Sequence, residues 1–313
     1  MSGPVREDTD TTATPERDRP APACVEISDS REAHLGEVRI RRALPRRGRR
    51  TVGAWCFADH MGPADVTPER SLDVGPHPHI GLQTVTWLTD GQLLHRDSLG
   101  SEQVIAPGQL NLMTSGGSVT HSEEATGHYG GTLEGIQLWV ALPEATRHGD
   151  AEFEHHAELP QLDLDGAQAT VLLGEFEGGT SPGRRDTELV GVDLVMHSAT
   201  TVPLRPEFEY GLVVLSGSVA VDGQALTPGH LGYLGRGRDE LGVDVREPAR
   251  VMLIGGVPFE ERILMWWNFV ARSREEIEEA QASWARRDDR FARVDSPLDR
   301  IPAPTPFWQK TGR

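Results

Sequence analysis

The sequence contains very little cysteine. Only Cys24 and Cys56 occur among its 313 residues, and Cys56 lies within the apolar run Ala54–Phe57. Two cysteines placed in this way do not make a disulfide framework, so a small, loop-rich domain stabilised by bridges is excluded. Cys56 is interpreted as a buried core thiol.

The sequence also lacks a long hydrophobic run. No uninterrupted apolar stretch approaches the roughly 20 residues that a membrane-spanning helix needs. The first residues are polar, charged and rich in Pro and Thr, without the apolar segment of a signal peptide. We therefore expect no membrane association, and the default expectation is a soluble cytoplasmic protein.

Basic residues are scarce compared with acidic ones. The chain has 31 Lys and Arg against 48 Asp and Glu, a formal net charge of −17, and Lys310 is its only lysine. Because phosphate contacts dominate affinity for nucleic acids, so acidic a chain is a poor candidate for direct duplex binding. The arginine-rich stretches Arg39–Arg42 and Arg46–Arg50 are expected to form an exposed strand and turn, although they could also meet an anionic partner.

Glycine and proline are abundant. The 34 Gly and 22 Pro, in a chain that is 37% hydrophobic, indicate many turns between short strands. This pattern is typical of all-β folds. A chain of 313 residues exceeds the usual size of one hydrophobic core, so we expect two domains.

Two short motifs carry the main functional signal. They are His77-Pro78-His79 and His121-Ser122-Glu123. In a β-strand, residues i and i+2 point to the same face, roughly 7 Å apart at their Cα atoms. Two such pairs on facing strands can therefore converge on one ion. A single His-x-His is often just two surface histidines, but two ligand pairs at strand spacing favour a metal site. Three imidazoles and one carboxylate suit a first-row transition metal better than calcium or magnesium.

The residues around these motifs favour strands. Pro78 restricts His77 to extended conformations. The run Leu82–Leu88 is rich in β-branched and aromatic residues, which predicts a strand. Asp90-Gly91 then predicts a turn.

The same residues resemble the signature of the pirin family within the cupin superfamily. The resemblance extends over about residues 35–284, nearly the whole ordered chain expected from the sequence. Its segments are Asp59–Pro63, Pro76–Gly81, Gly91, Pro107-Gly108, Met113–Gly117, His121–Glu123, Gly135–Val140, Gly255–Pro258 and Trp267–Val270.

Pirins are bicupins, so the resemblance implies an all-β fold of two tandem cupin (jelly-roll-type) β-barrels, with a short C-terminal helix. In this family the N-terminal barrel holds one metal, usually iron, through residues that match His77, His79, His121 and Glu123. The expected cofactor is one divalent transition metal per chain. Fe(II) ranks first, and Mn, Co, Ni, Cu and Zn are alternatives that the same ligand types accept.

The sequence departs from the general cupin pattern at Gln83, where general cupins and many pirins have Glu. Since pirins take their carboxylate ligand from the position of Glu123, the resemblance implies that Gln83 does not remove the site. We expect it to change the surroundings of the site or the substrate preference.

The chain divides into consecutive segments. We expect a flexible N-terminal tail (1–34), an N-terminal metal-binding cupin barrel (35–142), a connection (143–168), a C-terminal cupin barrel (169–257), a closing segment with a helix (258–288) and a C-terminal tail (289–313). The second barrel has His197 and His230 but no His-x-His or His-x-Glu pair, so we expect it to lack a metal.

A helix is predicted near the C-terminus. Ser273–Glu276 reads as a capping box that opens it. Ile277, Ala280 and Trp284 then share one face, which we expect to dock on the barrels.

The remaining histidines are predicted to play smaller parts. His95, His128 and His148 are expected on the surface or in loops. The adjacent His155 and His156 would face opposite ways in a strand and could not easily share a metal. His60 lies in a segment that resembles the family and is expected to border the site.

The first functional hypothesis is an oxygen-dependent, metal-assisted ring cleavage, because some pirins cleave the flavonol quercetin with O2. The substrate would be flavonol-like or otherwise enolizable. Glu123 is the expected proton acceptor, since it would lie beside the coordinated substrate oxygen.

The second hypothesis comes from another class. Pirins also act as regulators that bind partner proteins, and here the metal would be structural or redox-sensing. The acidic composition and the Arg39–Arg50 cluster are compatible with a protein partner but do not require one. The sequence leaves open the choice between the two, the substrate, the native metal and the oligomeric state.

Overall fold

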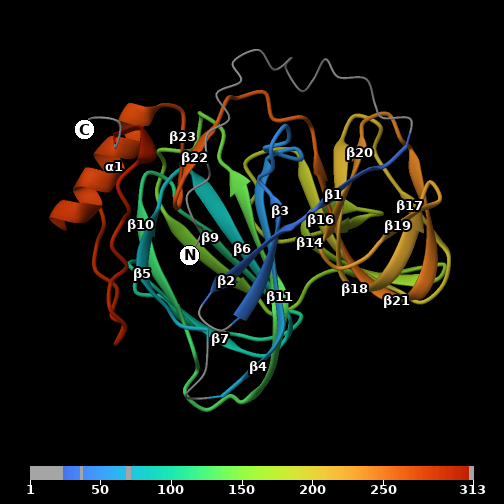
Figure 1. Cartoon of the computed structure of the whole chain (residues 1–313), viewed down its shortest axis with the longest axis horizontal. Helices are drawn as coiled ribbons and strands as arrows, with labels where there is room; N and C mark the ends of the chain where they lie inside the picture. The colour runs from blue at the N-terminus through green and yellow to red at the C-terminus, as the bar shows by residue number, and fades with distance from the viewer. Residues whose placement is uncertain (1–23, 36–37, 68–71, 310–313) are drawn as a thin grey trace.

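A computed structural model describes residues 24–35, 38–67 and 72–309. It contains two β-rich domains side by side, with the helix α1 (Arg274–Arg286) at the outer end of the N-terminal domain (Figure 1). The pairings between its named strands are antiparallel, and one isolated parallel bridge joins Ile80 to Phe269. The all-β class is therefore confirmed.

The N-terminal domain is built from two facing sheets. Its larger sheet has the order β12-β9-β6-β11-β4-β3-β2 and its smaller sheet the order β5-β10-β7-β8. The larger sheet contains β2 (Arg31–Leu35), β3 (Val38–Leu44), β4 (Trp55–Val66), β6 (Leu82–Asp90), β9 (Leu110–Thr114), β11 (Gly131–Ala141) and β12 (Glu152–His156). The smaller sheet contains β5 (Val74–His79), β7 (Leu93–Asp97), β8 (Glu102–Ile105) and β10 (Val119–Glu124).

The C-terminal domain has one ten-stranded sheet with the central order β1-β20-β18-β21-β16-β14-β13. Its strands are β1 (Glu26–Asp29), β13 (Gln161–Leu164), β14 (Ala167–Phe176), β15 (Gly179–Thr180), β16 (Leu189–Met196), β17 (Thr200–Pro203), β18 (Glu209–Val221), β19 (Gln224–Leu226), β20 (His230–Gly235) and β21 (Glu240–Gly256). The sheets of both domains remain open, so the expected barrels are jelly-roll-type sheets that do not close.

A short closing region follows the C-terminal domain. It comprises the hairpin β22 (Leu264–Trp266) and β23 (Phe269–Ala271), then α1, then a 3-10 turn η2 (Phe307–Gln309). Ser273 caps α1 by accepting a hydrogen bond from Glu276 N at 3.3 Å, as predicted. Ile277, Ala280 and Trp284 are buried, as predicted, but they pack mainly with the hairpin β22–β23, and with Ile80 of the N-terminal domain.

Three of the expected segments contain more structure than predicted. Part of the N-terminal tail, residues 1–23, lies outside the described residues, but residues 26–29 form β1 and residues 31–35 form β2. Within the expected connection, β12 joins the N-terminal sheet and β13 the C-terminal sheet. In the expected C-terminal tail, Ile301 N donates to Pro76 O at 3.0 Å. These contacts join residues far apart in sequence, which local patterns do not reveal.

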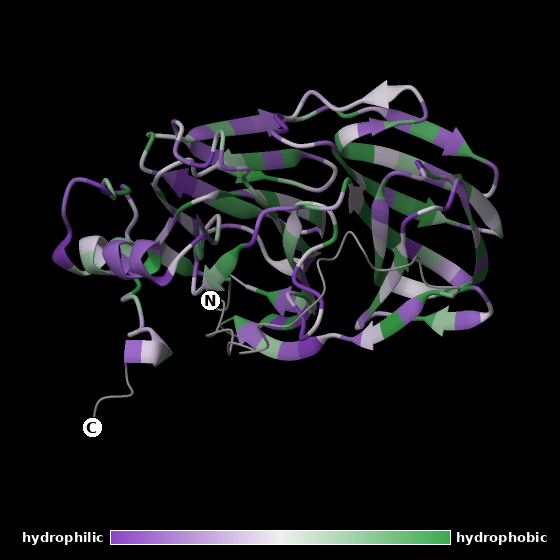
Figure 2. Ribbon diagram, turned by 90° about the horizontal axis from the view of Figure 1, so that it is seen from above, coloured by the Kyte–Doolittle hydropathy of each residue, from purple (hydrophilic) through white to green (hydrophobic). Residues whose placement is uncertain are grey.

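Hydrophobic and hydrophilic residues alternate along many of the strands (Figure 2), and the buried hydrophobic ones form the interior of each domain. The interior of the C-terminal domain is a cluster of apolar side chains such as Val171, Val192 and Leu253. A second cluster joins the domains, because Trp87 and Leu112 of one pack with Leu172 and Met252 of the other.

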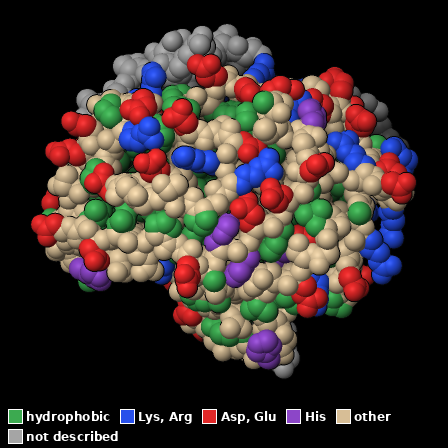
Figure 3. Space-filling view, turned by 180° about the vertical axis from the view of Figure 1, so that it is seen from behind, with side chains coloured by type: hydrophobic (Ala, Val, Ile, Leu, Met, Phe, Trp, Pro, Cys, Tyr) green, Lys and Arg blue, Asp and Glu red, His purple; other side chains and the backbone are tan. Residues whose placement is uncertain are grey.

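The surface and the cysteines agree with the sequence analysis. Acidic side chains are spread over the face seen in Figure 3. Both cysteines are free thiols, Cys24 exposed and Cys56 buried, so the prediction of no disulfide is confirmed. No helix in the described part of the chain combines the length and apolar character that a membrane span requires.

Candidate metal centre

Strands β5 and β10 place three histidines together. The two strands are antiparallel neighbours, with His121 opposite His77 and Val119 opposite His79. Residues that face each other across a sheet, or that lie two apart on one strand, share a face. His77, His79 and His121 therefore point to the same side of the smaller sheet.

Their ligand atoms lie within 4.8 Å of one another, and all three side chains are buried. His79 Nε2 is 3.1 Å from His121 Nε2. Two nitrogens bound at about 2.1 Å to one ion, at right angles, would be about 3 Å apart. The donor set and its spacing thus fit a transition metal ion.

In His77 and His79, the ring nitrogen that faces away from the cluster already forms a hydrogen bond. His77 Nδ1 bonds to Gly75 O at 2.9 Å and His79 Nδ1 to Asn268 O at 3.0 Å. Because a carbonyl oxygen only accepts, Nδ1 carries the proton in both rings. Nε2 of each then has its lone pair free for an ion, which is the usual arrangement of metal-binding histidines.

Burial also keeps these rings neutral. It lowers the pKa of His77 to about 4, and lowers the pKa values of His79 and His121 well below the ordinary value. The neighbouring imidazoles lower the latter two further. Neutral imidazole is the form that binds metals, so the cluster is ready for an ion at neutral pH.

Glu123 does not belong to this group of three. The pairing of β10 with β5 shifts between His121 and Glu123, because Glu123 lies opposite Val74 rather than Gly75. Such a bulge re-aims the side chains on either side of it. Burial raises the pKa of the Glu123 carboxyl. Its predicted role as fourth ligand and proton acceptor stays a prediction.

The structure corrects the expectation for His95. This residue is buried on β7, with its Nδ1 3.4 Å from His121 Nδ1 and its Nε2 3.0 Å from Asp97 Oδ2. It is neither on the surface nor in a loop. The spacing of His95 and Asp97 repeats the i, i+2 pattern of the two predicted motifs, and that signal could have revealed it.

His60 and Gln83 lie apart from the three histidines. His60 is buried on β4, with Nε2 3.4 Å from Glu134 Oε1, and is not in the cluster. Gln83 donates to Thr114 Oγ1 at 2.9 Å and to Arg184 O at 3.2 Å, on the face of β6 that carries the interdomain residue Val85. This position favours a role at the domain interface over the predicted effect on the site.

Aromatic rings border the histidines. Trp139 meets His79 edge-on, with ring centroids 5.2 Å apart, and stacks on Phe57 at 4.0 Å. Phe153 stacks on His95 at 4.2 Å. The surroundings of the cluster are therefore apolar and aromatic.

The closing region completes the environment of His79. Its partner Asn268 lies in the turn between β22 and β23, next to Trp267, whose φ of +52° is rare for so large a side chain. Val270 N donates to Ile80 O at 3.1 Å and so holds the hairpin against the end of β5. The sequence did not reveal Asn268, because this residue acts through its backbone carbonyl rather than its side chain. It also lies 189 residues from His79.

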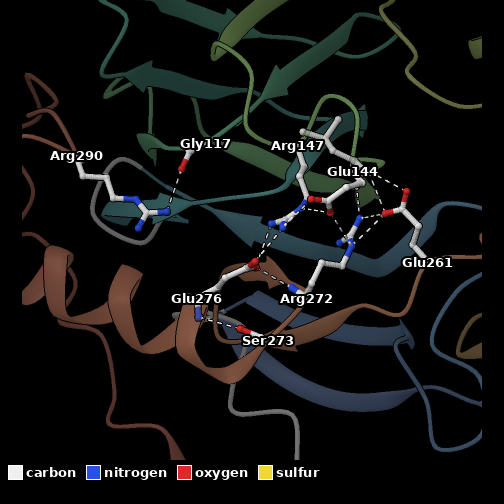
Figure 4. Close-up of polar contacts among 9 residues, drawn as sticks. Gly117, Glu144, Arg147, Glu261, Arg272, Ser273, Glu276 and Arg290 are labelled. Atoms are coloured by element: carbon white, nitrogen blue, oxygen red, sulfur yellow. Dashed lines mark hydrogen bonds and ion pairs between the residues drawn. The ribbon is translucent and has the colours of Figure 1, made fainter.

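Ion pairs fasten this region to the N-terminal domain (Figure 4). The buried Arg147 donates to both carboxylate oxygens of Glu276 on α1, at 3.0 and 2.8 Å. Arg272 donates its backbone N–H to Glu276 at 2.9 Å and its guanidinium to Leu142 O at 2.8 Å. The Glu276 carboxylate thus bonds to these arginines. In a full capping box it would instead accept a hydrogen bond from Ser273 N.

Two family models match the chain. The Pirin model matches residues 37–140, and the Pirin C-terminal cupin domain model matches residues 189–292. The first of these ranges contains the histidine cluster.

Individual relatives agree with these matches. A Pseudomonas aeruginosa protein, provisionally named a quercetin 2,3-dioxygenase, is 46% identical over 278 residues, 88% of each chain. A pirin-like protein of Caulobacter vibrioides is 39% identical over 82% of this chain and 92% of its own.

Solved structures give the same result. A crystal structure of quercetin 2,3-dioxygenase from Acinetobacter baumannii has a TM-score of 0.87 at 45% identity, over 90% of this chain and 95% of that one. A bacterial pirin from Escherichia coli in complex with nickel(II) shares the fold, with a TM-score of 0.60 at 14% identity, over 75% of this chain and 100% of that one. From the two family models and these relatives, the chain belongs to the pirin family of bicupins.

Proposed function

We propose that this protein is a metal-dependent dioxygenase that cleaves quercetin, or a related flavonol or enolizable substrate, with O2. The observation that carries the proposal is the convergence of three buried, neutral imidazoles, with ligand atoms within 4.8 Å, in the N-terminal cupin domain. The names of two similar proteins, from Pseudomonas aeruginosa and Acinetobacter baumannii, support quercetin as the first substrate to test.

The ion would be held by His77, His79 and His121, with Glu123 as the fourth ligand. A divalent metal bound there supplies Lewis acidity, which lowers the pKa of a coordinating hydroxyl group. Fe(II) is the first choice, because the family usually holds iron. Other metals are also tested, because a bacterial pirin has been solved in complex with nickel(II).

The protein's own groups would supply binding and proton transfer. Trp139 and Phe153 make the surroundings of the histidines aromatic and apolar, which suits a flat aromatic substrate. Glu123 would take the hydroxyl proton on its carboxylate. The raised pKa of this carboxyl makes the carboxylate a better base than an exposed one.

The test is turnover by the purified full-length chain. Apoprotein loaded separately with Fe(II), Mn(II), Co(II), Ni(II) or Cu(II) is mixed with quercetin, and the flavonol absorbance and dissolved oxygen are recorded together. We expect stoichiometric loss of both with at least one metal. His77→Ala and His121→Ala should lose both metal and activity, whereas His128→Ala, at an exposed position, should keep them.

Absence of turnover with every metal, in protein that holds the metal, would overturn the flavonol assignment. A partner protein retained by the loaded wild type but not by His79→Ala would then support the regulatory alternative.

A further inference from the structure

A third pair of residues at strand spacing lies beside the histidine cluster. His95 and Asp97 are on β7, and both are buried, each 3% exposed. Strand β10 runs between β5 and β7, so His121 has His77 opposite it on one side and Asp97 on the other. The three strands thus bring the three ligand histidines and this pair onto one face of the smaller sheet.

Hydrogen bonds hold Asp97 firmly. Its Oδ1 accepts from Leu99 N at 2.9 Å and from Ser101 N at 3.0 Å, within the turn that follows β7. Its Oδ2 is 3.0 Å from His95 Nε2. A carboxylate only accepts hydrogen bonds, so His95 Nε2 carries a proton and donates it to Asp97.

This assignment determines the next contact. In a neutral imidazole that donates through Nε2, Nδ1 is an acceptor. His95 Nδ1 lies 3.4 Å from His121 Nδ1, which then acts as the donor. His121 Nε2 is left with its lone pair and lies 3.1 Å from His79 Nε2, inside the cluster.

The plane of the His95 ring is also restrained. Phe153 stacks on it with centroids 4.2 Å apart and an interplanar angle of 9°. His77 and His79 take their orientation from backbone carbonyl groups, whereas His121 takes it from a side chain that packing and hydrogen bonding hold in place.

We propose that Asp97 and His95 form a relay of positioning residues that fixes the tautomer and orientation of His121 for metal binding. The relay rests on the proposed function only in that His121 is a metal ligand. It is independent of which substrate is cleaved. Outer partners of ligand histidines typically contribute about 10- to 100-fold to metal affinity.

The first test is Asp97→Asn. Its Oδ1 can still accept from Leu99 and Ser101, so its NH2 group faces His95. His95 Nε2 must then accept and its Nδ1 must donate, which forces His121 to protonate Nε2 on the metal side. We expect Co(II) affinity, from absorbance titration of the apoprotein, to fall about 10- to 100-fold. Asp222→Asn, which alters an ion pair with Arg238 in the C-terminal domain, should leave it unchanged.

Two substitutions of His95 separate a relay from simple packing. Gln can donate to Asp97 through Nε2 and accept from His121 through Oε1, so His95→Gln should retain part of the affinity. His95→Leu fills similar space but can do neither, and it should lose more. The ligand-field spectrum of bound Co(II) should change more in the His95→Leu variant than in the His95→Gln variant.

The outcomes distinguish the two proposals. Wild-type affinity in Asp97→Asn, or equal affinity in His95→Leu and His95→Gln, would overturn the relay alone. Wild-type protein that binds Co(II) but never consumes quercetin with any metal would overturn the flavonol activity and leave the relay supported. Wild-type protein that binds no Co(II) would overturn the metal site and both proposals.

Discussion

Burial decides the protonation of the three ligand histidines. Burial makes a positive charge on His77, His79 or His121 unfavourable, and neighbouring rings oppose the protonation of His79 and His121. Their pKa values are therefore low before any metal binds. At the scale of single residues, the site favours a cation by keeping its own imidazoles uncharged.

This burial makes the stability of the metal-free protein depend on pH. The pKa of His77 is about 4 in the folded chain and 6.5 for an ordinary histidine, so the unfolded state binds more protons between these values. The contribution of neutral His77 is fully present above pH 6.5 and is lost as the pH falls towards 4, on the order of 3 kcal/mol.

We expect the urea midpoint of the apoprotein to fall between pH 7 and pH 4.5, and to fall less in His77→Gln. His128→Gln, at an exposed position, should follow the wild type. Identical pH profiles for wild type and His77→Gln would contradict the assignment.

The carboxylate at position 123 should matter for metal binding rather than for folding. Glu123 lies at the bulged end of β10 and is less buried than the three histidines. Glu123→Gln replaces an anionic ligand by a neutral amide of the same size and removes the proton acceptor. We expect a thermal midpoint close to that of the wild type, weaker metal binding and loss of turnover. Full Co(II) affinity in Glu123→Gln would remove this residue from the ligand set.

Strand β5 depends on elements that follow the C-terminal domain. The hairpin β22–β23 supplies Asn268 O to His79. Gly81, just after β5, adopts a φ of +70°, and a Cβ there would lie 2.2 Å from Val270 O. The hairpin can approach β5 this closely because position 81 has no side chain.

Gly81→Ala should therefore push the hairpin away from the metal strand. Gly108 is a matched control, since its φ is +78° and a Cβ there would meet nothing within 4 Å. Both variants incur the left-handed backbone cost of about 1–2 kcal/mol. We expect only Gly81→Ala to lose metal affinity as well, measured by Co(II) titration. Equal affinity in the two variants would show that the hairpin does not support the site.

The two domains share one core at the scale of the whole molecule. Trp55, on the N-terminal side, donates its Nε1–H to Val190 O at 3.2 Å and to Gly255 O at 3.1 Å in the C-terminal sheet. Trp87 likewise donates to Asp193 Oδ2 at 3.0 Å. Such continuous packing favours joint unfolding.

We expect a single calorimetric transition for the metal-free chain. Trp55→Ala should lower that whole transition, with a loss of about 3–5 kcal/mol. Leu99→Ala, at a side chain that is 49% exposed, should change stability by less than about 0.5 kcal/mol. Two separate transitions in the wild type would show that the domains unfold independently.

The asymmetry of the domains predicts one metal ion per chain. Among the described residues, one group of potential ligands converges, and it lies in the N-terminal domain. The interior of the C-terminal domain is filled by apolar side chains. His230 Nδ1 accepts a hydrogen bond from Thr227 N at 3.1 Å. Elemental analysis should give one ion per chain and none in His77→Ala. Two ions per wild-type chain would contradict this account.

Patterns within a few residues were sufficient for part of this structure. The i, i+2 spacing of His77 and His79 indicated a shared strand face, and Ser273 marked the start of a helix. Both signals depend only on backbone geometry, which repeats over a few residues. The family resemblance likewise predicted the two cupin domains.

The tertiary structure alone decided which distant groups support the histidines. His95 reaches His121 because β7 pairs with β10, and Asn268 reaches His79 because the closing hairpin returns to β5. The two partners lie 26 and 189 residues from the histidines that they contact. Strand order and chain return depend on the packing of the whole chain, so no local pattern encodes them.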